Sequence, residues 1–430
     1  MIFISIGLLI AAVVIRTPSA YLHGWGMFGT DANAHYYQEM FQDRWGMVTM
    51  TFVVFMAAAI RFYKHWSLAL FFAVVAGSAA WLSFRAEVNL PSEYDKAILR
   101  ADSAQALVAL FAMAGLVMID MNVKRLALIE RTLGALCVLE SVVTIAQWGL
   151  PPQFRGGLLA SPTVSGCFIA FTFPFLTLRS CRQAFAILAL PLGALAVFAI
   201  LLKGASQPVM VLAVANLAAF WKNPSKSVHP KGFKLSATIA ALLVSALVVA
   251  ATSSKKTEFR AEGHQHRSIW DDSGRRHIWE MVMVPWVEQG SWRTHLFGEG
   301  TGSTITILRL FQENEERQLH TDGKPYVKTA MFWDNLHCEP LQVLLENGTL
   351  GLLAGLICVA FGFYFAWQKS AHLFAGYSAY LASCVFNPPN HWPVHAAVGA
   401  LILAMVFEPM ARWGDTRLAE IINVRILKEE

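Results

Sequence analysis

The sequence predicts an all-α polytopic membrane protein with about twelve transmembrane helices and one large, partly helical extracytoplasmic loop between spans nine and ten. The first reason is composition: 56% of the 430 residues are hydrophobic and only 15% are charged, which is too apolar for an ordinary soluble protein. The second is distribution, because the charges lie in short segments between apolar runs. The net charge of +5 is therefore spread over membrane loops and gives no nucleic-acid signal.

The apolar runs can be counted against the roughly 20 residues that a spanning helix needs. They lie at residues 2–15, 47–61, 66–84, 103–121, 126–150, 160–178, 184–202, 208–221, 233–252, 349–367, 373–386 and 394–410. The first, second, eighth and eleventh are short, so tilted or re-entrant helices fit them as well. The first run lacks a basic leader and a cleavage site before Arg16, so we interpret it as a retained span.

Lysines and arginines in the short loops indicate which side of the membrane each loop faces. An even number of spans puts both termini on one side, and most of the cations gather there: Arg61, Lys64, Lys124, Arg125, Arg179, Arg182, Lys222, Lys226, Lys231, Lys234, Lys369, Arg412, Arg417, Arg425 and Lys428. The opposite short loops carry fewer cations: Arg16, Arg44, Arg85, Lys96, Arg100, Arg155 and Lys203. Both termini are therefore predicted to be cytoplasmic.

This topology divides the chain into four parts. Residues 1–252 contain spans one to nine, 253–348 form the extracytoplasmic loop, 349–410 contain spans ten to twelve, and 411–430 form a cytoplasmic tail. The loop is rich in tryptophan: Trp270, Trp279, Trp286, Trp292 and Trp333. A disordered linker has fewer aromatic residues. We therefore expect the loop to be folded and to lie near the membrane surface, where tryptophan prefers the headgroup region.

The strongest candidate for a functional site is the stretch from Phe332 to Gly351. His337 comes directly before a helical pattern that begins at Pro340, a residue favoured in a first helical turn. The pattern places three leucines on one face: Leu341, Leu344 and Leu345. His337 is therefore expected at a helix N-terminus, where the free N–H groups favour an anionic ligand. A capping or packing histidine is the alternative interpretation.

Two arginines in the loop are candidates for phosphate recognition. Arg275 and Arg276 precede a helical pattern that runs toward Trp286. The planar guanidinium group binds phosphate oxygens through two parallel hydrogen bonds. Solvated charges, or charges that bind lipid headgroups, are the alternative.

Two further patterns in the loop give weaker signals. The glycines of Leu296 to Gly302 permit a tight turn, and without a βαβ context a structural turn is favoured over a nucleotide loop. His264 and His266 lack an obvious third metal ligand, so a polar loop is favoured.

Polar side chains inside the apolar runs give no clear site. The six cysteines are scattered without a CxxC pair, so neither a zinc site nor a disulfide framework is indicated. Glu140 lies inside the fifth span, where a charge is a functional candidate by default. Its pairing with Arg131 is doubtful at more than two helical turns, so the sequence leaves Glu140 without an explanation.

Together these stretches resemble the O-antigen ligase family, part of the O-antigen ligase and polymerase superfamily of membrane glycosyltransferases. The family signature is a histidine, a polar residue, nine residues and Gly-x-x-Gly. His337, Gly348 and Gly351 match it, and Cys338 stands where the polar residue is usual, which is a modest departure. Ser273-Gly274-Arg275 with Trp279 matches an upstream motif, and Leu296 to Gly302 resembles the glycine turn that follows it. Nine spans, a large periplasmic loop and three spans are also the family layout.

The resemblance implies a metal-independent, inverting transfer of a glycan from undecaprenyl diphosphate to an acceptor hydroxyl at the periplasmic face of the bacterial inner membrane, without a cofactor. His337 is the expected base or acceptor orienter. Arg275 is the expected diphosphate contact, and Arg276 is expected to assist it. Glu339 is a possible orienter of His337, although a solvated carboxylate is the alternative.

A more important departure from the family pattern lies in the short loop before residue 208. Where members commonly have a Ser-Arg pair, this chain has Ser206 and Gln207. Lys203, at the other end of the same short loop, is a candidate for the missing cation, because lysine also binds phosphate. Arg155 is a second candidate.

The leading hypothesis for the acceptor is the lipid A-core oligosaccharide, which would make the chain an O-antigen ligase. Alternatives within the superfamily are a polysaccharide polymerase and a protein O-glycosyltransferase. One dominant periplasmic loop and a modest length favour the ligase slightly. A transporter is a more distant alternative, which the division into nine and three spans disfavours.

Overall fold

The computed structural model describes residues 74, 77, 123–147, 162–177, 186–202, 206–222, 275–300, 303–304, 307–308, 336, 338–386, 395 and 398–408. All statements about structure concern these residues. Their regular secondary structure is helical, and no strand occurs among them. This confirms the predicted all-α class for the described part of the chain.

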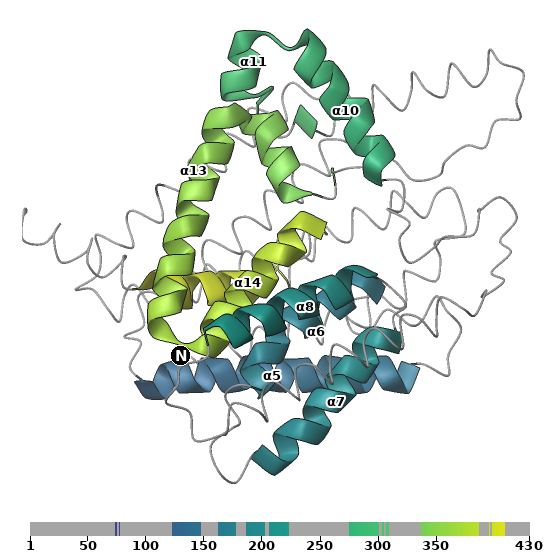
Figure 1. Cartoon of the computed structure of the whole chain (residues 1–430), viewed down its shortest axis with the longest axis vertical. Coiled ribbons are helices and arrows are strands. Elements are labelled where there is room, and N and C mark those ends of the chain that lie inside the picture. Colours follow the sequence, from purple (N-terminus) through teal and green to yellow (C-terminus); the bar gives the residue numbers. More distant parts are fainter. Residues whose placement is uncertain are drawn as a thin grey trace, which may run out of the picture.

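A helical bundle occupies the lower half of Figure 1. It contains α5 (Val123–Ala146), α6 (Pro162–Thr177), α7 (Ala186–Leu202), α8 (Ser206–Trp221) and α14 (Ala371–Phe386). A further helical segment, Val398–Glu408, packs into the same core. Helix α6 contacts α5, α7, α8 and α14, and every side chain from Val164 to Leu176 is buried. A helix that is apolar on all sides suits this central position.

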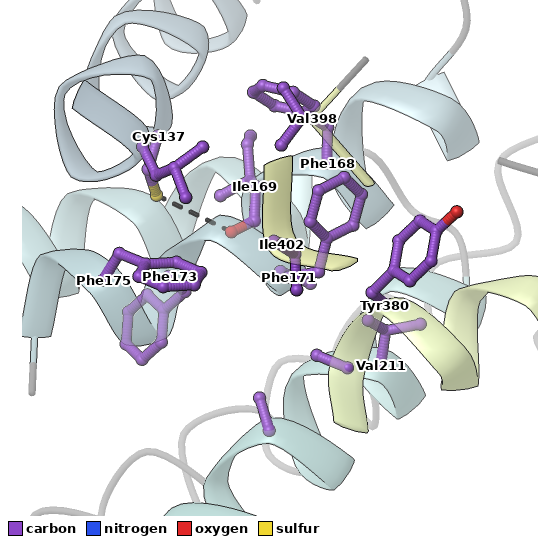
Figure 2. Packing of buried hydrophobic residues seen from close by; sticks show 14 of the residues in the cluster. Cys137, Phe168, Ile169, Phe171, Phe173, Phe175, Val211, Tyr380, Val398 and Ile402 are labelled. Atoms are coloured by element: carbon purple, nitrogen blue, oxygen red, sulfur yellow. Dashed lines mark hydrogen bonds between the residues drawn. The ribbon is translucent and has the colours of Figure 1, made fainter. Parts of the chain in front are cut away.

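Aromatic rings fill the core between α6 and the C-terminal helices (Figure 2). Phe168 and Phe171 of α6 meet edge to face, with ring centroids 5.4 Å apart. Phe171 makes a similar contact with Tyr380 of α14 at 5.9 Å. Such edge-to-face pairs are favourable beyond the area that they bury. The packing therefore joins α6 directly to α14, one of the last helices in the described part of the chain.

The buried carboxylate of Glu140 has a partner on the neighbouring helix. It accepts a hydrogen bond from the hydroxyl of Ser165 on α6, and the hydroxyl of Thr144 lies 3.5 Å from that of Ser165. Arg131, by contrast, is exposed. Hydrogen bonding offsets part of the cost of placing a polar group in an apolar bundle. The local sequence could not reveal Ser165, because it lies 25 residues further along the chain.

The longest described helix, α13 (Glu339–Lys369), joins the upper unit of Figure 1 to the bundle. It is kinked at Gly348, whose φ of 67° and ψ of −170° are not helical. The part before the kink packs against the upper helices, and the part after it runs down to the corner with α14 (Figure 1).

Charged groups hold the corner between α13 and α14. Lys369 pairs with Glu408 at 3.1 Å and also donates to the carbonyl of Met405. On the other side of the corner, His372 pairs with Glu130 of α5. The corner is thus connected to the first and the last described helices of the bundle.

Helices occur at seven of the predicted spans: 126–150, 160–178, 184–202, 208–221, 349–367, 373–386 and 394–410. Among the described residues, Glu339–Lys369 alone is long and apolar enough to cross a membrane by length and composition. The shorter apolar helices are Thr163–Leu176, Pro191–Leu202, Gln207–Trp221 and Val398–Glu408. The other predicted spans lie outside the described residues, apart from Val74 and Gly77, which are helical. The count of twelve stays a prediction.

Candidate functional site

The candidate site is built on a small unit above the bundle (Figure 1). The unit contains α10 (Arg275–Gln289), α11 (Trp292–Phe297) and the first part of α13. It has a hydrophobic core of its own, formed by Val282, Leu308, Leu336 and Leu345, with Trp279, Trp286, Ile307 and Leu341 packed against it. Residues far apart in the sequence therefore share one core.

A hydrogen bond connects α10 to Leu336, the residue before His337. The indole Nε1–H of Trp279 donates to the carbonyl of Leu336 at 2.7 Å, across 57 residues of sequence. Leu336 is fully buried and directly precedes His337 in the chain. Arg275 begins α10, one helical turn or roughly 5.4 Å before Trp279 along the helix axis. The bond therefore brings together the two sequence segments that carry Arg275 and His337.

Two glycines allow α11 and α13 to meet backbone to backbone. Gly298 and Gly348 both have positive φ, 76° and 67°. A Cβ on Gly348 would lie 2.3 Å from the carbonyl of Leu296, and one on Gly298 would lie 2.3 Å from that of Glu346. No real side chain fits at such distances. Glycine is thus required at both positions, for its backbone conformation and for space.

The kink at Gly348 frees helix carbonyls that the glycine turn then uses. The N–H of Glu299 donates to the carbonyl of Leu345, and that of Gly300 donates to the carbonyl of Glu346, both at 2.9 Å. In a regular helix these carbonyls accept from residues four positions later. The prediction of a structural turn at Leu296 to Gly302 is thus confirmed as far as Gly300, because the turn pairs with α13.

Two local contacts support this arrangement. The hydroxyl of Thr349, just after the kink, donates to the carbonyl of His295 at 3.0 Å. The imidazole Nε2–H of His295 in turn donates to the carbonyl of Trp286 at 2.8 Å, and the two rings meet edge to face at 4.7 Å. Helix α11 is therefore fixed to both α10 and α13.

Part of the predicted site falls within the described residues. Helix α13 begins at Glu339, one residue before the predicted start, with Pro340 in its first turn and Cys338 as N-cap. Glu339 is half-buried in that first turn. Gln207 is buried near the start of α8.

The remaining predicted residues are covered only partly or not at all. Arg275 and Arg276 form the start of α10, but their side chains lie outside the described part. His337, Lys203 and Arg155 also lie outside the described residues, as do His264 and His266. Of the motif glycines, Gly348 forms the kink, and Gly351 follows it within α13.

Sequence reasoning missed three contributors to the site. The carbonyl of Leu336 leaves no trace in a sequence pattern, because every residue carries a backbone carbonyl. His295 is an ordinary loop residue by sequence. Glu346 is a buried carboxylate that accepts from the amide of Gln342 at 3.3 Å. The four-residue spacing of Gln342 and Glu346 was the available signal.

No protein-family model matches the sequence, and no curated protein matches it either.

The contribution of the Trp279 indole can be measured directly. Trp279→Phe keeps a ring in the core but leaves the buried Leu336 carbonyl without its donor. We expect this to lower the free energy of unfolding by roughly 1–3 kcal/mol. Thermal unfolding in detergent measures the effect. Trp292→Phe is the matched control, because Trp292 is largely exposed, and equal effects of the two changes would refute the role of the bond.

Proposed function

We propose that this protein is a membrane glycosyltransferase of the O-antigen ligase type. It moves a glycan from an undecaprenyl diphosphate carrier to a hydroxyl of the lipid A-core oligosaccharide at the periplasmic face of the bacterial inner membrane. The proposal includes about twelve spans, with both termini cytoplasmic.

One observation carries the proposal: the separate sequence motifs behind the family resemblance belong to one packed unit. The Arg275 motif is connected to the His337 segment through Trp279 and Leu336. The glycine turn is connected to the signature glycine through Gly298 and Gly348. Chance matches scattered over 80 residues have no reason to meet. Their convergence supports the interpretation of the motifs as parts of one site.

The chemistry of the transfer assigns a role to each proposed residue. The acceptor oxygen bonds to the anomeric carbon while the bond from that carbon to the diphosphate breaks, and the acceptor proton passes to the imidazole of His337. Negative charge develops on the departing lipid diphosphate. Arg275 and Arg276 stabilise this charge, and Lys203 and Arg155 are the further candidate cations.

Three other residues have supporting roles in the proposal. Gln207, at the position of the family's arginine, offers an amide that can donate hydrogen bonds but carries no charge. Glu339 orients His337. Gly348 sets the direction of the helix segment that follows His337, through the kink described above.

The proposal is tested with purified protein in liposomes, a lipid-diphosphate-linked glycan as donor, and EDTA in the buffer. Lipid A-core, the growing glycan and a pilin are offered as acceptors in separate reactions. We expect transfer to lipid A-core in EDTA. Transfer only to the growing glycan or to the pilin would replace the acceptor and keep the reaction class. No transfer in any reaction would overturn the proposal.

A companion variant tests donor handling. Arg275→Ala is expected to raise the KM for the donor, because a phosphate contact is lost, and Arg131→Ala on the exposed side of α5 is the matched control. An unchanged KM in Arg275→Ala would remove Arg275 from the donor site.

A further inference from the structure

Four neutral side chains of the upper unit, which we call the polar cluster, each have a buried polar atom that lacks a hydrogen-bond partner. The atoms are Nε1 of Trp286, Oγ of Ser303, Oγ1 of Thr304 and Oε1 of Gln342. Thr304 is fully buried. A buried polar group without a partner costs free energy, so each one in a native protein calls for an explanation. The described part of the bundle is larger but has one such atom, Nδ1 of His395.

Two members of the polar cluster lie where the glycine turn pairs with α13. The N–H of Ser303 donates to the carbonyl of Gly300 at 3.1 Å, and the N–H of Gly300 donates to the carbonyl of Glu346 at 2.9 Å. The amide of Gln342 donates to the carboxylate of the same Glu346 at 3.3 Å. Ser303 and Gln342 therefore both neighbour Glu346, one from the turn and the other from α13.

The other two members face the small core of the unit. Thr304 and Leu308 are both helical, and a spacing of four residues places them on one helix face. Leu308 is a member of the small core, and Trp286 packs against that core. Trp286 also meets the ring of His295 on α11, the helix that leads into the glycine turn. The polar cluster thus approaches one region from α10, from α13 and from the helical residues after the turn.

The hydrogen-bonding types of these atoms identify the class of ligand. The indole Nε1–H of Trp286 only donates, Oε1 of Gln342 only accepts, and the two hydroxyls do both. A phosphate would need donors alone, and a metal cation would need acceptors alone. The buried carboxylate of Glu346 beside the cluster also disfavours an anion. A neutral sugar matches the mixed set, because each of its hydroxyls both donates and accepts.

The order of residues along α10 indicates which substrate supplies the sugar. Arg275 begins the helix, which runs from there toward α11 (Figure 1). Trp279, bonded to Leu336, comes next, and Trp286 follows roughly 10 Å further along the axis at 1.5 Å per residue. In an inverting transfer the acceptor attacks the face of the sugar opposite to the leaving group. With the diphosphate at the Arg275 end, the acceptor lies toward Trp286.

We propose that the polar cluster is a subsite for a neutral sugar of the acceptor. This inference rests on the proposed function, and it restricts the acceptor to a glycan in place of a protein. The four atoms are enclosed, so the sugar reaches them when the glycine turn moves away from α13, to which two main-chain hydrogen bonds join it. The sugar hydroxyls then supply the partners that the protein does not.

Thr304→Val tests the subsite, because valine has nearly the shape of threonine without the hydroxyl, and Ser303→Ala removes the second hydroxyl. The liposome assay uses lipid A-core as acceptor, with the growing glycan in a parallel reaction. We expect each variant to raise the KM for the glycan acceptor roughly 3- to 10-fold, the effect of one hydrogen bond, and to leave the KM for the donor unchanged. The Tm should not fall, because the hydroxyl has no protein partner to lose.

Thr172→Val is the matched control. Thr172 is a fully buried threonine of the bundle, and its hydroxyl donates to the carbonyl of Phe168 on its own helix. We expect both KM values to stay at the wild-type level in this variant.

The outcomes separate the inference from the proposed function. A higher KM for the glycan acceptor without a fall in Tm supports the inference. An unchanged acceptor KM in both variants, or a higher donor KM instead, overturns it while transfer by the wild type upholds the proposed function. A lower Tm with an unchanged acceptor KM also overturns it, because the hydroxyls then bind ordered water as part of the fold. Transfer by the wild type to a pilin alone overturns the inference and keeps the reaction class. No transfer by the wild type overturns the proposed function itself.

Discussion

His337→Ala is expected to reduce glycan transfer about 10²- to 10⁴-fold, the usual contribution of a general base. Without the imidazole, the acceptor hydroxyl has no positioned group to take its proton as it attacks. The reconstituted transfer assay measures the rate with saturating donor and acceptor. We expect the variant to insert into the membrane normally, since the hydrogen bond from Trp279 uses the backbone of Leu336 and not the histidine side chain.

Two controls make this result specific. His266→Ala removes a loop histidine that the sequence gives no chemical role, and it should transfer at the wild-type rate. His337→Gln keeps most of the side-chain volume, so a loss in both His337 variants with unchanged thermal unfolding assigns the effect to chemistry. Full activity in His337→Ala would exclude His337 as the general base.

Gly348→Ala is expected to destabilise the unit above the bundle by on the order of 3 kcal/mol or more. An alanine at positive φ is strained, and its Cβ would lie 2.3 Å from the carbonyl of Leu296, which belongs to the backbone and cannot rotate away. We expect the contact between α11 and α13 to open and transfer to fall sharply. Thermal unfolding and hydrogen exchange at Glu299 and Gly300, whose amides pair across this contact, provide the measurements.

Other glycines of the chain supply matched controls. A Cβ on Gly355, within helical α13, meets nothing within 4 Å, so Gly355→Ala should be neutral or stabilising by about 0.5–1 kcal/mol. Gly300 has a φ of 101° but open space around it, so Gly300→Ala should have an intermediate effect from backbone strain alone. If Gly348→Ala proves as harmless as Gly355→Ala, the backbone contact does not form.

Local patterns predicted the helices well and their partners poorly. The apolar runs located α6, α7, α8 and α14 to within about two residues, because an uninterrupted apolar run of this length marks a helix that is buried or spans a membrane. The start of α13 was also predicted, since Pro340 marks a first turn. The kink was not, because Gly348 reveals its positive φ only through its contact with Leu296. The residues around a glycine in an apolar helical pattern do not indicate whether a distant backbone segment packs against it.

In the candidate site, too, the residues were predicted but their contacts were not. Local spacing singled out Arg275, His337 and the glycine turn as separate motifs, and only the family resemblance grouped them. The connections are made by the Trp279 indole and by backbone carbonyls, across 57 residues in the case of Leu336. The partner of Glu140 could not be predicted either, because Ser165 lies on another helix. Long-range hydrogen bonds follow from packing, which a periodic pattern does not encode.

The pairing of the glycine turn with α13 has a consequence for how this region tolerates change. The two hydrogen bonds that join them involve main-chain atoms alone, and the side chains of Glu299 and Asn347 are exposed. Those positions are therefore free to vary while the junction stays intact. A saturation mutagenesis scan should show Gly298 and Gly348 as intolerant positions, while Glu299 and Asn347 beside them tolerate most substitutions. The contact between the glycine turn and α13 can therefore be kept in sequences that share little more than these two glycines.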